Sequence, residues 1–147
     1  MSNTVNEGRR QSDLAKRLVD QLTDAVNARD LEAIDDLVTA TYRHQAPGSP
    51  LTLDELKHLN RAFYAGFPDL RWEIERLVAE DNFAVAFWRA RGTHQGTFMG
   101  RPATGRAITL AGINTYRIAD GRIAEDTPHW EFSTLLNQLG SANRRSC

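Results

Sequence analysis

The side chains best suited to chemistry in this chain of 147 residues are its four histidines, because histidine can ligate a metal or carry a proton near neutral pH. His44, His58, His94 and His129 lie far apart, without paired spacing and without a neighbouring cysteine. Metal sites are usually signalled by ligands a few residues apart on one element. The histidines therefore predict no metal site.

The sequence also lacks the motifs that hold dinucleotides, phosphates or an acyl-transfer serine: G-x-G-x-x-G, the P-loop and G-x-S-x-G. The glycine-rich stretch Gly92–Gly105 lies between two strand-like segments and not ahead of a helix, so it predicts a structural turn instead of a phosphate cradle. His94 belongs to this turn and is not expected to be catalytic. We expect no tightly bound metal, flavin or nicotinamide.

The first half of the chain, which must position these residues, has helical periodicity. Apolar residues recur every three or four positions from Ser12 to Ala28, which predicts an amphipathic helix. Asp30 can cap a second, short helix. After a short extended piece at Thr41–Ala46, Thr52 and Glu55 have the spacing of a capping box and predict the start of a third helix.

After Pro68, which ends the third helix, the pattern changes to alternation and predicts four strands, near residues 72–78, 83–93, 107–118 and 123–130. Trp72, Ile74, Arg76 and Val78 are expected on one side of the first strand. A hairpin turn at Asp120-Gly121 joins the last two strands, and a closing helix follows at 132–139. Helices followed by antiparallel strands form an α+β pattern, with the helices on one face of a curved sheet.

The strand from Phe83 to Thr93 has two contrasting faces. On one face, small alanines surround Trp88, which leaves space and favours a cavity wall or, alternatively, close packing by a helix. The opposite face carries Phe83, Val85 and Phe87, and no helix remains to cover it. Exposed apolar strand faces usually mark an interface, so we expect a homodimer through this face.

Composition limits the remaining possibilities. The length suits one domain, expected at 12–140 between disordered tails at 1–11 and 141–147. The net charge of −1 predicts no nucleic-acid partner, and no apolar run approaches the roughly 20 residues of a membrane span. The only cysteine, Cys147, cannot form an internal disulfide, which favours a reduced, cytoplasmic location.

Three motifs in the second half of the chain carry a family resemblance. G-T-H-x-G-x-x-x-G-x-P-x-T-G-R begins at Gly92, D-G-R-I begins at Asp120, and L-L-x-Q-L-G ends at Gly140. Their order resembles the SnoaL-like polyketide cyclases of the nuclear-transport-factor-2-like superfamily. The resemblance covers roughly residues 14–140. It implies a cone-shaped α+β barrel, a curved sheet wrapped around N-terminal helices, with one apolar pocket.

The resemblance also places residues in that pocket. In cyclases of the family, a histidine on the penultimate strand and a His-x-Asp pair on the last strand face the substrate. At these positions the present chain has Asn114, Asp126 and Pro128, so the usual catalytic aspartate is missing. Asp126 lies two residues earlier, which on a strand preserves the face. We therefore expect Asp126 to be the general acid/base, with His44 and Asn114 polarising a carbonyl.

The remaining site expectations concern the pocket wall. Trp88, Trp130, Tyr116 and His129 are the expected substrate-binding residues, each with the alternative of a purely structural role. Glu131 either faces the pocket in place of His129 or begins the closing helix, where a negative charge is favourable.

The resemblance implies a cofactor-free cyclase or isomerase acting on a small, hydrophobic, oxygenated polyketide-type intermediate of natural-product (antibiotic) biosynthesis. Two alternatives stay open. Some family members lack the aldol dyad and assist hydroxylation, and other superfamily members are non-catalytic binding proteins. The missing aspartate favours these alternatives, whereas the displaced carboxylate and His44 favour acid/base chemistry.

Overall fold

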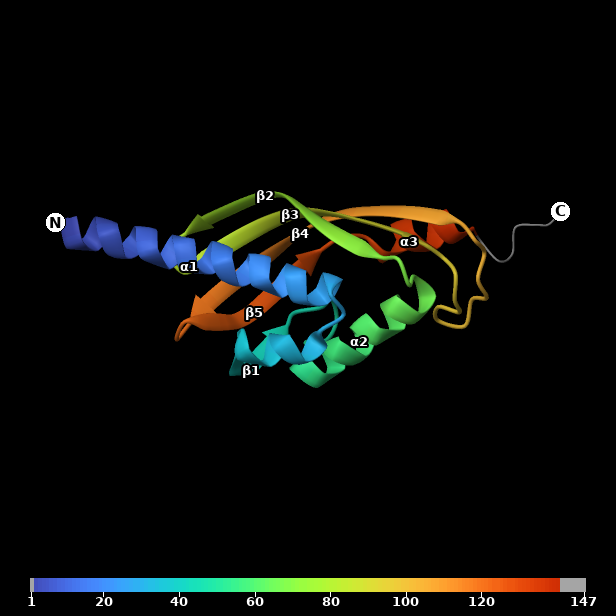
Figure 1. Ribbon diagram of the computed structural model, residues 1–147, viewed down its shortest axis with the longest axis horizontal. Coiled ribbons are helices and arrows are strands. Elements are labelled where there is room, and N and C mark those ends of the chain that lie inside the picture. Colours follow the sequence, from blue (N-terminus) through green and yellow to red (C-terminus); the bar gives the residue numbers. More distant parts are fainter. Residues whose placement is uncertain (1, 141–147) are drawn as a thin grey trace.

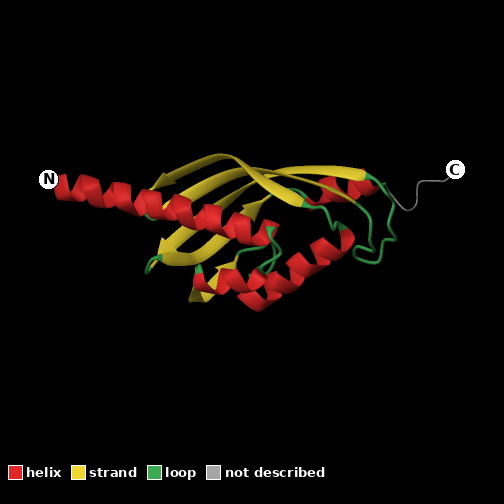
Figure 2. Ribbon diagram, in the orientation of Figure 1, coloured by secondary structure: helices red, strands yellow, loops and turns green. Residues whose placement is uncertain are grey.

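The computed structural model of the protein describes residues 2–140, which form a curved, unclosed sheet with helices on its concave side (Figures 1 and 2). The strand order is β1-β5-β4-β3-β2. The strands are β1 (Val38–His44), β2 (Arg71–Glu80), β3 (Phe83–Thr93), β4 (Ala107–Ala119) and β5 (Arg122–His129). The helices are α1 (Ser2–Asn27), the 3-10 helix η1 (Leu31–Asp36), α2 (Leu53–Gly66) and α3 (Phe132–Leu139). The predicted α+β class, with a curved sheet wrapped around N-terminal helices, is confirmed.

One pair of strands departs from the expected antiparallel arrangement. β1 pairs in parallel with β5 and places His44 beside Asp126, whereas every other neighbouring pair is antiparallel. The prediction of four antiparallel strands with only an extended piece at Thr41–Ala46 is wrong in this detail. The reason is that strand formation here depends on a partner about 80 residues later in the chain, which local alternation does not reveal.

A β-bulge in β2 inverts the expected alternation. The register shifts between Ile74 and Arg76, so Trp72 and Ile74 line the concave side, whereas Leu77 packs against the core after the bulge. Val78 is 45% exposed. The prediction that all four residues share one face is therefore wrong for Arg76 and Val78, because one extra residue exchanges the two faces of a strand.

α1 is longer than the sequence predicted. It begins at Ser2, so residues 2–11, expected to be a disordered tail, are helical. Once a helix is nucleated, extending it by one residue costs little free energy, and most of these polar residues have adequate helix propensity. Ser12 Oγ also donates to Gly8 O (3.0 Å) and accepts from Asp81 N (3.0 Å), which ties this part of α1 to the β2–β3 turn. The other expected tail, 141–147, lies outside the described residues.

α2 begins and ends where the sequence predicts. Thr52 Oγ1 accepts from Glu55 N at 3.2 Å and Glu55 Oε1 accepts from Thr52 N at 2.9 Å, which completes the capping box. Tyr64, near the end of α2, donates its hydroxyl to Val26 O at 2.8 Å. This bond joins α2 to the end of α1 and helps to fix the helical wall of the cup.

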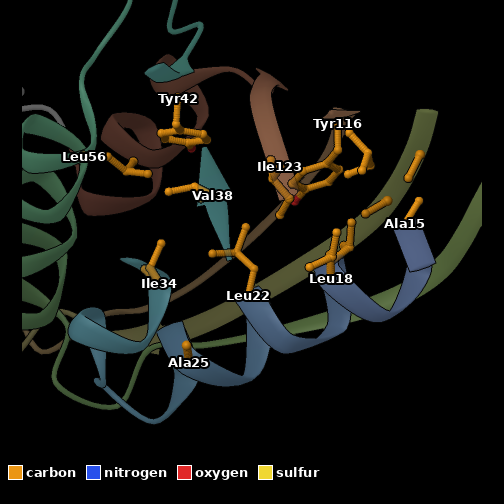
Figure 3. Packing of buried hydrophobic residues seen from close by; sticks show 14 of the residues in the cluster. Ala15, Leu18, Leu22, Ala25, Ile34, Val38, Tyr42, Leu56, Tyr116 and Ile123 are labelled. Carbon is orange, nitrogen blue, oxygen red and sulfur yellow. The ribbon is translucent and has the colours of Figure 1, made fainter. Parts of the chain in front are cut away.

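Two apolar clusters fill the space between helices and sheet. In the first, Ala15, Leu18 and Leu22 of α1 point toward side chains of β1, β4 and β5 (Figure 3). The second is aromatic and includes Phe63 and Phe67, with Leu135 of α3 fully buried among its members. Residues of both clusters also line one cavity, which therefore lies between them.

Candidate active site

The cup contains a cavity of about 160 Å³ with an apolar helical wall and a polar strand wall. Leu22 and Val26 of α1, and Leu56, Leu59 and Phe63 of α2, supply most of the helical wall. The strand wall carries the groups able to do chemistry: His44 of β1, Asn114 and Tyr116 of β4, and Asp126 of β5. An apolar cavity with a few convergent polar groups is typical of a small-molecule site.

His44 and Asp126 form a close pair on this wall. The distance from His44 Nδ1 to Asp126 Oδ1 is 2.5 Å, and the two residues are register partners on the parallel strands β1 and β5. Gln45 N donates to Asp126 O at 2.7 Å and fixes the backbone between them. Asp126 is only 4% exposed, so its carboxylate depends on His44 for compensation. The short contact suits the sharing and transfer of a proton.

Two buried tyrosines flank the Asp126 carboxylate. Burial first, and the nearby Asp126 charge second, raise the pKa of Tyr42 well above its ordinary value. The same two causes raise the pKa of Tyr116, and hydrogen bonding by Asn114 opposes the rise. The buried hydroxyl of Tyr42 also interacts with the Asp126 carboxylate, which adds to the rise in its pKa, but it makes no hydrogen bond of ordinary geometry within residues 2–140. Both phenols therefore remain protonated and are potential donors toward the carboxylate.

Asn114 is held from one side by a tryptophan. Trp88 Nε1 donates to Asn114 Oδ1 at 2.9 Å. Trp88 in turn packs edge-on against Trp130, with ring centroids 6.4 Å apart and an interplanar angle of 71°. Across the ladder from Asn114 lies Pro128, the position at which the resemblance predicts an aspartate. Pro128 therefore offers the Asn114 NH2 group no carboxylate as a hydrogen-bond acceptor.

The structure brings six of the seven predicted site residues together around the cavity: His44, Trp88, Asn114, Tyr116, Asp126 and Trp130. His129 does not line it. Asp126 and Pro128 point inward on β5, so His129 points outward and is exposed. This corrects the expectation of a substrate contact. Glu131 is also exposed and lies at the start of α3, so neither of these alternatives faces the cavity.

Sequence reasoning missed two polar residues near the site. Tyr42 precedes His44 by two positions on a strand, and this spacing puts both on one face. Asn60 lines the cavity from α2, one turn after Leu56. A polar residue inside an otherwise apolar helical stripe was the available signal.

Neither a metal site nor a membrane-spanning helix is found within residues 2–140. Within this range no three side chains of histidine, cysteine, aspartate or glutamate gather in a way that could hold a metal ion. No helix in the described part of the chain is both long and apolar enough to cross a membrane.

A family model described as SnoaL-like polyketide cyclase matches residues 16–139. No curated protein matches the sequence. Among solved structures, the chain is similar to wild-type IdmH from Streptomyces antibioticus, a candidate polyketide cyclase. The two are 28% identical with a TM-score of 0.78, covering 86% of this chain and 99% of IdmH.

Two further structures show the same architecture. AclR from Streptomyces galilaeus, a candidate hydroxylase, is 26% identical with a TM-score of 0.78, covering 86% of this chain and 95% of AclR. A candidate SnoaL-like polyketide cyclase from Jannaschia sp. CCS1 has a TM-score of 0.80, covering 88% of this chain and 94% of that one. At 18% identity, this last likeness concerns the fold alone.

Proposed function

The chain belongs to the SnoaL-like polyketide cyclase family, and from this premise we propose that it is a cofactor-free cyclase or isomerase. Its substrate is a small, hydrophobic, oxygenated polyketide-type intermediate of natural-product biosynthesis. The observation that carries the proposal is the buried pair of Asp126 and His44, 2.5 Å apart on the polar wall of an otherwise apolar cavity. Similarity to IdmH, a candidate polyketide cyclase, supports it.

Asp126 is the general base and acid of the proposed reaction. Its carboxylate takes a proton from the carbon next to a substrate carbonyl, and the C–H electron pair moves to the carbonyl oxygen to form an enolate. His44 and Asn114 stabilise this oxygen by donating hydrogen bonds. In a cyclisation, the enolate carbon bonds to a second carbonyl carbon, whose oxygen receives the proton from Asp126. In an isomerisation, the proton returns to a different carbon of the same substrate.

The aromatic wall supplies orientation in this proposal. Trp88 and Trp130 lie edge to face beside the polar groups, and Tyr116 is paired across the ladder with Asp126. A flat, apolar substrate held against these rings presents its carbonyl edge to Asp126 and His44. Holding reacting groups together in this way removes much of the entropic barrier to ring closure.

Hydroxylation is the second candidate function, and two observations favour it. AclR, a candidate hydroxylase, is 26% identical to this chain. In addition, Pro128 occupies the cavity position at which the resemblance predicts the catalytic aspartate. A hydroxylase consumes molecular oxygen, whereas the proposed proton transfer does not, so the two functions differ in a measurable requirement.

The test is an incubation of the purified protein with an extract of the pathway that lacks it, with and without oxygen, in D2O. We expect turnover without oxygen and incorporation of solvent deuterium into the product, and we expect both to disappear with the Asp126→Asn variant. Turnover only in the presence of oxygen would replace the proposal by hydroxylation. Tight ligand binding without turnover under either condition would identify a binding protein instead.

We further propose that the protein is a homodimer through the convex face of the sheet. No helix of residues 2–140 covers that face, and Val78, Phe83 and Phe87 remain 45%, 46% and 37% exposed on β2 and β3. A second copy can pair the same patch with itself around a twofold axis. Light scattering should give a dimer for the wild type and a monomer for the double variant Phe83→Asp, Phe87→Asp.

The matched control for the dimer is Met99→Asp. Met99 is 59% exposed but lies in the loop between β3 and β4, away from the convex patch. This variant should remain dimeric. A wild type that is monomeric at micromolar concentration would contradict the dimer and leave the chemistry of the cavity untouched. For the location, we propose the cytoplasm, because one cysteine offers no internal disulfide that needs an oxidising compartment.

A further inference from the structure

We infer that Trp88 is a positioning residue that fixes the amide of Asn114, so that the Asn114 NH2 group points into the cavity and binds a substrate carbonyl oxygen. The inference deepens the proposed function and rests on it, because it assumes that a carbonyl group is bound at this wall. Trp88 then orients the Asn114 amide, whereas the sequence predicted only that it lines the pocket.

The orientation of the amide follows from the chemistry of indole. Trp88 Nε1–H can only donate a hydrogen bond, so the atom of Asn114 that lies 2.9 Å away must be the acceptor Oδ1. The NH2 group then points away from Trp88. One of its two N–H bonds can act on the Tyr116 hydroxyl, where hydrogen bonding by Asn114 opposes the rise in the pKa of Tyr116, and the other N–H is left for a ligand.

The cross-strand neighbours of Asn114 leave this NH2 group available to a ligand. Asn114 is paired with Ala86 on β3 and with Pro128 on β5, and neither side chain can accept a hydrogen bond. All three residues line the cavity. A carboxylate in place of Pro128 would lie beside the amide as a ready acceptor. With Pro128, the donor is left to the contents of the cavity, and a carbonyl or enolate oxygen is the complementary group.

Gly112 makes the position of Trp88 possible. It is the cross-strand partner of Trp88, and a Cβ at Gly112 would lie 2.5 Å from Trp88 Cζ2 and 2.8 Å from Trp130 Cβ. The indole therefore occupies the space that any other residue would fill. Trp130 packs edge-on against the Trp88 ring, so Gly112 and Trp130 together restrict the direction of the Trp88 N–H.

The test compares two bicyclic probes of nearly equal shape, 1-indanone and indane, which differ in one carbonyl oxygen. One net hydrogen bond is worth roughly a two- to tenfold change in affinity, so the ratio of the 1-indanone affinity to the indane affinity should be higher in the wild type than in Asn114→Ala by at least about that factor. In Asn114→Ala the carbonyl is buried without this donor and its desolvation is left uncompensated. With a 13C-labelled carbonyl, the infrared C=O stretch of bound 1-indanone should lie at lower frequency in the wild type than in this variant.

Trp88→Phe keeps an aromatic ring and removes the N–H, so the Asn114 amide is free to rotate. We expect the ketone preference and the carbonyl frequency to move most of the way toward the Asn114→Ala values. Trp72→Phe is the matched control, because Trp72 lines the same cavity from β2, is paired with Ala90 and is not an aromatic partner of Trp88, and its indole N–H makes no hydrogen bond within residues 2–140. It should change the binding of both probes to a similar extent and keep their ratio.

The ratio of the two affinities is measured on the same variant, so a lower fraction of folded protein affects both affinities equally and leaves the ratio unchanged. An Asn114→Ala variant with the wild-type affinity ratio and the wild-type carbonyl frequency would overturn the role of Asn114. A Trp88→Phe variant with the wild-type ratio and carbonyl frequency would overturn the role of Trp88. If the ratios change as expected while Asp126→Asn retains full turnover, the positioning role stands and the proposed acid/base reaction fails.

Discussion

His44 and His94 both lie in the interior of the molecule, but their surroundings differ in what each ring can reach. His44 lines the cavity, and its Nδ1 lies 2.5 Å from the carboxylate of Asp126. His94 is fully buried outside the cavity lining, where its ring packs against Phe67 at a centroid distance of 5.3 Å. Its Nδ1 accepts from Thr104 N at 3.3 Å, and Thr104 Oγ1 lies 3.0 Å from the same nitrogen.

Burial alone does not identify a reactive histidine. A backbone N–H can only donate, so His94 Nδ1 is an acceptor and the ring proton lies on Nε2, which has no partner among the described residues. This ring fastens the loop between β3 and β4. His44 instead joins an ionisable partner to an open cavity, which are the two conditions for proton transfer to a ligand.

The strongest test of this contrast is Asp126→Asn, which keeps shape and hydrogen bonding but removes the titrating group. General acid/base steps typically contribute about 10²–10⁴ in rate, so kcat should fall by that factor while KM changes little. Steady-state kinetics with the substrate found in the extract experiment measures both. A variant with full rate would reduce the His44 region to a template for folding the substrate.

His94→Ala should show the opposite behaviour, a loss of stability without a loss of rate. Removing a fully buried ring from an aromatic cluster leaves a cavity, which should lower the free energy of unfolding by about 2–4 kcal/mol. Denaturant unfolding measures the change, and kcat per folded molecule should stay within about twofold of the wild type. A large decrease in kcat at unchanged stability would mean that His94 takes part in the reaction.

His44→Ala should reduce kcat by about 10- to 100-fold, less than Asp126→Asn, because it removes one charge-assisted hydrogen bond and leaves the carboxylate in place. His44→Gln retains a donor and should recover part of the rate. His44→Ala and His94→Ala together distinguish the two histidines. The His44 substitution should mainly lower kcat, whereas the His94 substitution should mainly lower the free energy of unfolding. If His44→Ala and His94→Ala have the same kcat and the same free energy of unfolding, the proposed difference between the two histidines is wrong.

The smallest expected effect concerns Tyr42, whose pKa is raised by burial and by the Asp126 charge. A raised pKa in the folded state means that stability is complete below pH 10 and is lost as the pH rises further, because the unfolded chain ionises first. One such group costs about 1.4 kcal/mol per pH unit above pH 10. Tyr42→Phe should therefore lose stability less steeply than the wild type.

Urea unfolding at pH 7 and between pH 10 and 11.5 checks this expectation. At pH 7 the variant should be about as stable as the wild type, because the Tyr42 hydroxyl makes no hydrogen bond of ordinary geometry within residues 2–140 that the variant would lose. If the free energy of unfolding falls equally steeply with pH in both proteins, Tyr42 does not have the raised pKa that its burial implies.

Local signals in the sequence predicted much of the scaffold. The Thr52 capping box, the turn at Asp120-Gly121 and the alternation of β3 all appear in the structure, since each depends on residues a few positions apart. The family resemblance placed Asn114 in the cavity, and the resemblance together with strand parity placed Asp126 there; both line it. The expectation for His129 was wrong because the alternation continues through Pro128, so His129, one position later, points away from the cavity.

The pairing that gives the site its chemistry was decided only by the tertiary structure. His44 and Asp126 are 82 residues apart, and a parallel register between β1 and β5 brings their side chains within 2.5 Å. The bulge in β2 and the orientation of the Asn114 amide by Trp88 likewise depend on neighbours from other strands. Outside the bulge in β2, the sequence by itself therefore determined which residues of a strand share a face, because side-chain direction along a regular strand is local. Which of them meet was determined by strand register, which is a property of the folded sheet.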